Sequence, residues 1–269
     1  RRGEDNRGTS WSCSHGVSRW YKDCGCHTGG EPGWNQKWRT GLRDALNNLG
    51  DKIDSIFNNE VDRIFSGNLD SHELLKKAGT VFCGKVEMKK FVEELQVNYG
   101  FSDQDKTQLS HLLTGMKYKH FSFTSCGWFF NEISGIEPRQ DIKYAIHAIT
   151  LFQQFTREEL MIPFLNDLKK AKSNIREMGD GMLIAQEEIK GLDGDVEAAV
   201  YFYMNTSMAT PENWKRRYGI FYLKNISTED GKEVQTTVSD TSTDEEFSFR
   251  ILPALTIDKG INLYVTKIK

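Results

Sequence analysis

The sequence predicts an α+β protein, with a mainly helical bundle over about residues 35–190 and a small antiparallel β unit over residues 191–269. Apolar residues recur at three- and four-residue steps through most of the first part. The last part instead has short aromatic and β-branched runs separated by turn residues. The character changes around Gly191-Leu192-Asp193-Gly194. Residues 1–34 form a motif-rich loop that we expect to pack on the bundle, in a chain that holds one or two domains.

The longest predicted helix runs from about Asn35 to Phe65, and Gly67 and Asn68 end it. Its apolar residues form one stripe, which is typical of a helix that faces a core. The stripe consists of Trp38, Leu42, Leu46, Leu49, Ile53, Ile56, Val61 and Ile64.

Shorter helices are predicted downstream. They cover His72–Ala78 after a cap at Asp70 or Ser71, Lys85–Tyr99, and a segment opened by the capping box Ser102-Asp103-Gln104-Asp105. Pro138 suits the first turn of the next helix. A second capping box, Thr156-Arg157-Glu158-Glu159, is expected to open a helix that reaches Ile175.

The β unit is predicted to hold about five strands, and Asp230-Gly231 between two of them indicates a hairpin turn. The expected strands are Ala199–Met204, Trp214–Leu223, Val234–Val238, Phe247–Leu252 and Ile261–Ile268.

Composition excludes several classes of protein. The net charge of −3 and the lack of a dense Lys/Arg run argue against nucleic acid as a partner. No apolar run approaches the roughly 18 residues of a membrane helix, so no membrane partner is expected. Five cysteines cannot all pair within one chain, which favours a reduced, cytoplasmic location. The start at Arg1-Arg2-Gly3-Glu4, without methionine, suggests a piece of a longer protein.

Chemistry-bearing residues concentrate between Ser10 and Trp38. This stretch holds three of the five cysteines, two of the six histidines and four of the six tryptophans. Such a composition in a polar, glycine-rich segment is typical of a loop that presents side chains. We therefore look for a site there.

Four of these residues, Cys13, His15, Cys24 and Cys26, could bind a metal, since thiolate and imidazole suit zinc. Only one residue separates the members of each pair, whereas common zinc sites have two or more. The alternatives are thiols packed in the loop and a disulfide from Cys13 to Cys24 or Cys26. Cys126 could join a site shared with the downstream motif. No other cofactor is predicted.

The same loop could bind sugar, because aromatic rings cover pyranose faces and planar polar groups bind hydroxyls. Each tryptophan could equally be buried, Arg19 and Asp23 could form only an ion pair, and Trp38 is expected in the core. Nothing supports a catalytic carboxylate pair of the kind that glycoside hydrolysis needs, so this chain alone is predicted to be inactive. The candidate substrate-binding residues are Trp11, His15, Arg19, Trp20, Asp23, Trp34 and Trp128.

Two motif blocks carry a resemblance to a known family. W-S-C-S-H-G-V-S-R-W, followed by C-G-C and P-G-W-N-Q-K-W-R, and F-T-S-C-G-W-F-F-N-E-I-S-G-I-E at Phe123–Glu137 resemble domain-of-unknown-function family 3536. The resemblance covers roughly Thr9 to the last strands. In that family the domain follows a glycoside hydrolase family 57-type barrel. It implies an accessory domain of a glycosidase or glucanotransferase, with the upstream barrel of the same chain and an α-glucan or related oligosaccharide as partners.

On this hypothesis the Trp11–Cys26 loop closes one wall of the substrate cleft. Two alternatives remain open. One is a non-catalytic module that binds zinc or docks a protein, and the other is a structural brace whose loop only completes the bundle.

Overall fold

The structure, a computed structural model, describes residues 12–189, 194–208, 210–218, 221–229, 233–240, 243, 245–256 and 260–268. The chain divides into a helical unit, Arg1–Val86 with Phe91–Lys190, and a sheet unit, Glu87–Lys90 with Gly191–Lys269. The predicted α+β class is confirmed, because helices build the first unit and an antiparallel sheet builds the second.

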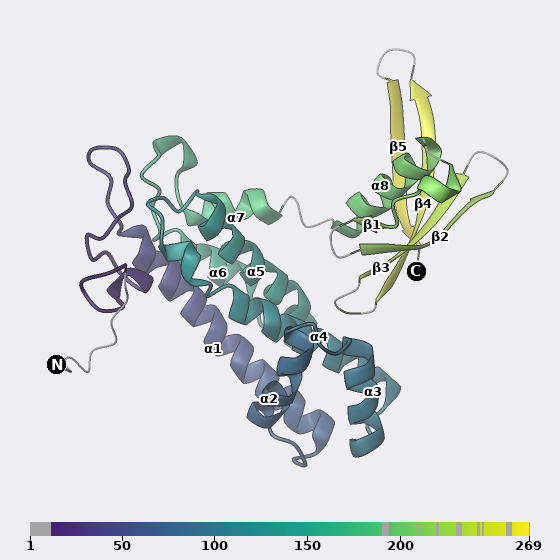
Figure 1. The fold of residues 1–269 in the computed structure, drawn as a ribbon, viewed down its shortest axis with the longest axis horizontal. Helices are drawn as coiled ribbons and strands as arrows, with labels where there is room; N and C mark the ends of the chain where they lie inside the picture. Colours follow the sequence, from purple (N-terminus) through teal and green to yellow (C-terminus); the bar gives the residue numbers. More distant parts are fainter. Residues whose placement is uncertain are drawn as a thin grey trace. The chain divides into compact units, whose positions relative to one another are not determined.

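Seven α-helices lie in the described residues up to 189, and most of their buried residues are apolar. They are α1 (Trp38–Phe65), α2 (Ser71–Phe82), α3 (Met88–Tyr99), α4 (Asp103–Phe121), α5 (Ile136–Phe152), α6 (Met161–Leu168) and α7 (Gly181–Ile189). The stripe predicted for the long helix is confirmed: seven of its eight residues, all except Ile56, are buried. In Figure 1, α1 runs the length of the helical unit, with the N-terminal loop at one end and α2 at the other.

Helix starts follow the predicted capping chemistry in two of three cases. The side chains of Asp70 and Ser102 accept hydrogen bonds from the backbone N–H of Glu73 and Asp105, which caps α2 and α4. The third prediction is wrong: α6 begins at Met161 and ends at Leu168 instead of running to Ile175. Thr156 Oγ1 accepts from the Glu158 backbone in a local turn, so it caps no helix.

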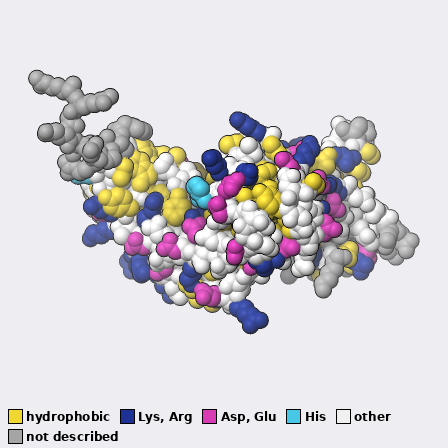
Figure 2. Space-filling model, turned by 90° about the horizontal axis from the view of Figure 1, so that it is seen from below, with side chains coloured by type: hydrophobic (Ala, Val, Ile, Leu, Met, Phe, Trp, Pro, Cys, Tyr) yellow, Lys and Arg dark blue, Asp and Glu magenta, His cyan; other side chains and the backbone are white. Residues whose placement is uncertain are grey.

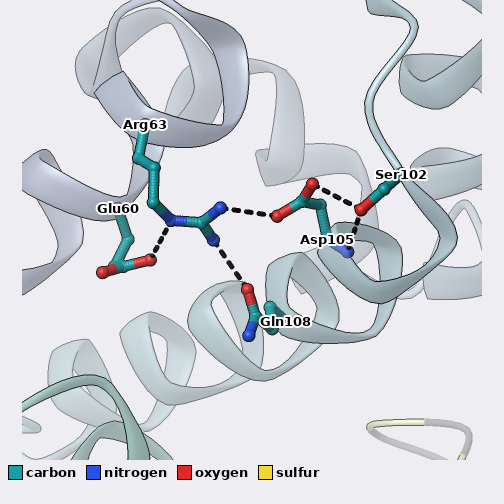
Figure 3. A network of polar contacts seen from close by, with 5 residues as sticks. All are labelled: Glu60, Arg63, Ser102, Asp105 and Gln108. Atoms are coloured by element: carbon teal, nitrogen blue, oxygen red, sulfur yellow. Dashed lines mark hydrogen bonds and ion pairs between the residues drawn. The ribbon is translucent and has the colours of Figure 1, made fainter.

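The first and fourth helices are also joined by a polar network on their surface. Arg63 donates to Glu60 at 2.8 Å, to Asp105 at 2.7 Å and to Gln108 at 2.6 Å. Figure 3 shows its guanidinium group between these acceptors, with Ser102 on the far side of Asp105. These residues line a hollow of about 360 Å³.

The sheet unit is an antiparallel meander with one helix packed on it. Its strands follow the chain order, β1 (Arg217–Tyr218), β2 (Phe221–Glu229), β3 (Glu233–Asp240), β4 (Glu246–Thr256) and β5 (Gly260–Ile268). Helix α8 (Gly194–Met208) packs against the sheet. The buried core of this unit comprises Ala198, Ala199, Phe202, Leu223, Val238, Phe249 and Ile251.

One predicted strand is wrong. Ala199–Met204 lies inside α8, because its buried residues Ala198, Ala199 and Phe202 recur at helical rather than alternate spacing. The predicted strand Trp214–Leu223 is divided between β1 and β2, which pair with each other. The hairpin residues Asp230-Gly231 lie outside the described residues.

The surface mixes both signs of charge. Figure 2 shows Lys and Arg side chains interspersed with Asp and Glu on the face drawn, and hydrophobic side chains gathered near the N-terminal loop. Among the described residues, no helix is long and apolar enough to cross a membrane.

Candidate metal centre

The N-terminal loop (residues 12–37) and the second block (residues 123–137) are joined by hydrogen bonds. The indole Nε1 of Trp20 donates to the carbonyl oxygen of Ser125 at 3.1 Å. The backbone N–H of Thr28 donates to Asn131 Oδ1 at 2.8 Å. The two blocks are about 100 residues apart in sequence, so the fold brings them together at one end of the helical unit.

Arg39, in the first turn of α1, holds both segments from inside. Its side chain is fully buried, Nη1 donates to the carbonyl oxygen of Cys26 at 2.8 Å, and Nη2 donates to that of Phe130 at 3.1 Å. The buried indole of Trp128 donates in turn to the carbonyl oxygen of Arg39 at 3.3 Å. Both bonds are part-buried and have a charged donor, so this arginine fixes the backbone of both blocks.

The loop brings Cys13, His15, Cys24 and Cys26 together. Their ligand atoms all lie within 4.8 Å of one another. The Sγ atoms of Cys13 and Cys24 are 3.6 Å apart, and Sγ of Cys26 lies 3.4 Å from His15 Nδ1. All four cysteines and histidines predicted as metal ligands are therefore in this cluster, while Cys126 is exposed in the second block and is not one of its members.

The backbone turn at Gly25 allows Cys24 and Cys26, only one residue apart, to face the same cluster. Gly25, between Cys24 and Cys26, has φ of +74°, a left-handed conformation that residues with a Cβ seldom adopt. The Gly25 N–H donates to Asp23 Oδ1 at 3.0 Å, which fixes the turn. Two cysteines separated by one residue thus point to a common centre.

The surroundings shift the pKa values of Cys13 and Cys24 in opposite directions. Burial raises the pKa of Cys13, but hydrogen bonds from the His15 and Arg19 backbone and from Cys24 and Cys26 outweigh it and lower this pKa from 9.0 to about 7. Burial, together with the neighbouring Cys13, raises the pKa of Cys24. Cys13 is therefore ionised more readily than Cys24.

Two buried guanidinium groups lie beside the cluster. The pKa of Arg39 is lowered, mainly by burial and also by the charge of Arg19. Cys24, Asp23 and Cys26 act in the opposite direction but do not outweigh burial. The Arg19 side chain is 3% exposed and its guanidinium carbon lies 4.8 Å from the ring centroid of Phe129. Asp23 accepts from the backbone of Gly25 and Gln36.

The residues predicted to bind substrate do not all reach the surface. Trp128 is fully buried and Arg19 nearly so, positions that fit packing rather than ligand contact. Trp20, Asp23 and Trp34 are partly exposed and His15 is exposed. Trp11 lies outside the described residues.

One of the two carboxylates of the second block, that of Glu132, is used inside the fold. Glu132 is 8% exposed, and its oxygens accept from Ser173 Oγ at 2.6 Å and from the Asn174 N–H at 2.8 Å. These bonds fix the segment after α6 against the second block. A carboxylate held in this way is poorly placed for general acid–base chemistry on a bound ligand.

Sequence reasoning missed Asp141, a carboxyl group buried on α5. It is 1% exposed, its Oδ2 has no hydrogen-bond partner, and burial raises its pKa to about 8. The carboxyl group lies against the backbone of Gly127 in the second block. Position 141 falls on the apolar stripe with Pro138, Ile142 and Ala145, a signal that could have identified it.

The chain belongs to the family DUF3536, described as a domain of unknown function, whose model matches residues 34–244. The match includes the second block and begins at Trp34, so Cys13, His15, Cys24 and Cys26 precede the matched residues. Comparisons with curated proteins and with solved structures give no match.

Proposed function

We propose that this chain is a non-catalytic accessory domain of a glycoside hydrolase family 57-like enzyme, in which the N-terminal loop forms one wall of the substrate cleft. Membership of DUF3536 and the resemblance of both motif blocks support the association with such an enzyme. One observation supports this role for the loop: the hydrogen bonds of Trp20 and Thr28 join the two blocks into one surface.

This surface has the properties that a sugar-binding wall requires. Trp20 and Trp34 expose part of their rings, and Asp23 and His15 offer polar groups close by in sequence. Flat aromatic surfaces beside a few polar groups suit the faces and hydroxyl groups of an oligosaccharide. The catalytic carboxylates would come from the barrel, and an α-glucan or related oligosaccharide is the proposed substrate.

The test uses the protein that carries this domain together with its catalytic barrel, assayed on a panel of α-glucans. We expect Trp20→Ala to lower kcat/KM by about tenfold or more, in keeping with the loss of a stacking contact and its positioning effect. Val97→Ala, a change at an exposed α3 residue, is the matched control. Activity on no glucan, or full activity of a folded Trp20→Ala variant, would contradict the proposal.

A second candidate is a protein-docking module. Exposed hydrophobic side chains on the same two segments favour it, namely Val17, Tyr21 and Phe130, which are 46%, 42% and 41% exposed. On this alternative Tyr21→Ala weakens the binding of a partner and leaves glucan hydrolysis unchanged.

A further inference from the structure

The ligand atoms of the Cys/His cluster have the geometry of an S₃N metal site. We propose that Cys13, His15, Cys24 and Cys26 bind one zinc ion, which holds the N-terminal loop in shape. This inference does not depend on the association with a glycosidase, because it concerns only the four side chains and their surroundings.

Two distances within the cluster are close to those of tetrahedral zinc. Zn–S bonds of about 2.3 Å and tetrahedral angles place two sulfur ligands about 3.8 Å apart, and a sulfur and a nitrogen ligand about 3.6 Å apart. The Cys13–Cys24 and Cys26–His15 separations are 3.6 and 3.4 Å. The widest separation, 4.8 Å, closes with a shift of about 1 Å.

The chemistry of the donors selects the metal. Three thiolates and one imidazole suit zinc, whereas magnesium and calcium prefer oxygen ligands. Binding replaces the three S–H protons, which pass to solvent, and involves no change of oxidation state. Four protein ligands fill a tetrahedral shell and leave no position for a reactive water, so the site is structural.

The surroundings supply an independent observation. Arg19 and Arg39 are 3% and 0% exposed, yet Arg39 donates to two carbonyl oxygens and Arg19 lies over an aromatic ring. Buried positive charges need negative charge nearby. Zinc with three thiolates carries a net charge of −1, so a loaded centre adds negative charge beside these two guanidinium groups, where Asp23 already supplies some.

A disulfide between Cys13 and Cys24 is the competing arrangement. Disulfide sulfurs lie about 2.05 Å apart, well below the 3.6 Å separation here, and all five cysteines are free. A disulfide would also remove two of the four ligands, so the two arrangements exclude each other.

The experiment measures zinc by elemental mass spectrometry in the 269-residue chain, produced without a polyhistidine tag in zinc-containing medium. We expect about one zinc per chain, and less than about a tenth of that after Cys24→Ser with Cys26→Ser. Cys83→Ser and Cys126→Ser, at exposed cysteines outside the cluster, are matched controls that should keep the metal.

A second measurement uses the wild-type chain alone, so it tests the proposal even if the cysteine variants fail to fold. A thiol-specific mercurial is added to the wild-type chain, and released zinc is followed with a chromogenic chelator; we expect release to track the blocking of the cluster thiols. A folded wild type with less than about a tenth of a zinc per chain overturns the proposal. So does a Cys13–Cys24 disulfide found by peptide mass spectrometry, or zinc retained by the folded double variant.

Discussion

The guanidinium group of Arg39 and the carbonyl oxygen of Cys26 are joined by a 2.8 Å hydrogen bond in the interior of the helical unit. This contact ties the start of α1 to the cysteine loop, and the second Arg39 bond, to Phe130, ties it to the second block. The buried side chain of Arg39 therefore contacts the cysteine loop, the second block and the bundle at once.

Arg39→Met should destabilise the helical unit by about 2–4 kcal/mol, because it leaves two part-buried carbonyl oxygens without their charged donor. Arg63→Met is the matched control. The Arg63 side chain, whose contacts Figure 3 shows, is 47% exposed, so its loss should cost about 1 kcal/mol or less. Denaturant unfolding monitored by tryptophan fluorescence measures both, since five of the six tryptophans belong to the helical unit. Equal effects of the two changes would refute the central role of Arg39.

Gly127→Ala should be strongly destabilising. A Cβ at this position would overlap Asp141 Oδ2 and lie 2.8 Å from its Cγ, and Asp141 is buried. Gly79→Ala in α2 is the control, because a Cβ there meets nothing within 4 Å and alanine favours helix by about 1 kcal/mol. Thermal unfolding should show opposite shifts for the two variants. A Gly127→Ala variant as stable as wild type would contradict the close packing of the Asp141 carboxyl group against Gly127.

Asp141 predicts a specific pH dependence. Burial raises its pKa from 3.8 to about 8, so the folded chain holds a proton that the unfolded chain releases between these values. The free energy of unfolding should therefore fall as pH rises through this window, by up to about 1.4 kcal/mol per pH unit. Asp141→Asn carries no titrating group, so its stability should lack this slope. Denaturant unfolding of both proteins between about pH 5 and 8 tests the difference, and parallel stability curves would rule it out.

Removal of the metal should loosen the loop and spare the bundle. The α1 core is built from apolar contacts that do not involve the cluster, whereas exposed Lys22 lies in the loop that carries the four proposed ligands. We expect a chelator to speed tryptic cleavage at Lys22 by about tenfold or more, with helical circular dichroism unchanged. Cleavage at exposed Lys85, between α2 and α3, is the internal control. Equal rates at Lys22 with and without chelator would argue against a metal-dependent loop.

Local chemistry predicted much of the fold. The α1 stripe and the caps at Asp70 and Ser102 are short-range features that depend on residues a few positions apart. Ala199–Met204 was wrongly predicted as a strand because a short apolar run has no clear period. Its helical conformation is seen only from its packing on the sheet. The end of α6 at Leu168 was missed for a related reason, since the segment after it is fixed by Glu132 from a distant block.

The candidate site was only partly predictable. The residue types of Cys13, His15, Cys24 and Cys26 indicated a metal site. The single residue between the members of each pair is shorter than the spacing of common zinc sites and argued against one. Their convergence depends on the backbone turn at Gly25, which no count of intervening residues reveals. Arg39 was missed because an arginine next to Trp38 gives no sign of burial, and its partners lie in segments remote in sequence.

The most direct test of the metal centre is X-ray absorption at the zinc edge on the purified, untagged chain. We expect about three sulfur neighbours near 2.3 Å and about one nitrogen neighbour near 2.0–2.1 Å. A first shell of only nitrogen and oxygen atoms, or a folded chain with no zinc absorption edge, would contradict it.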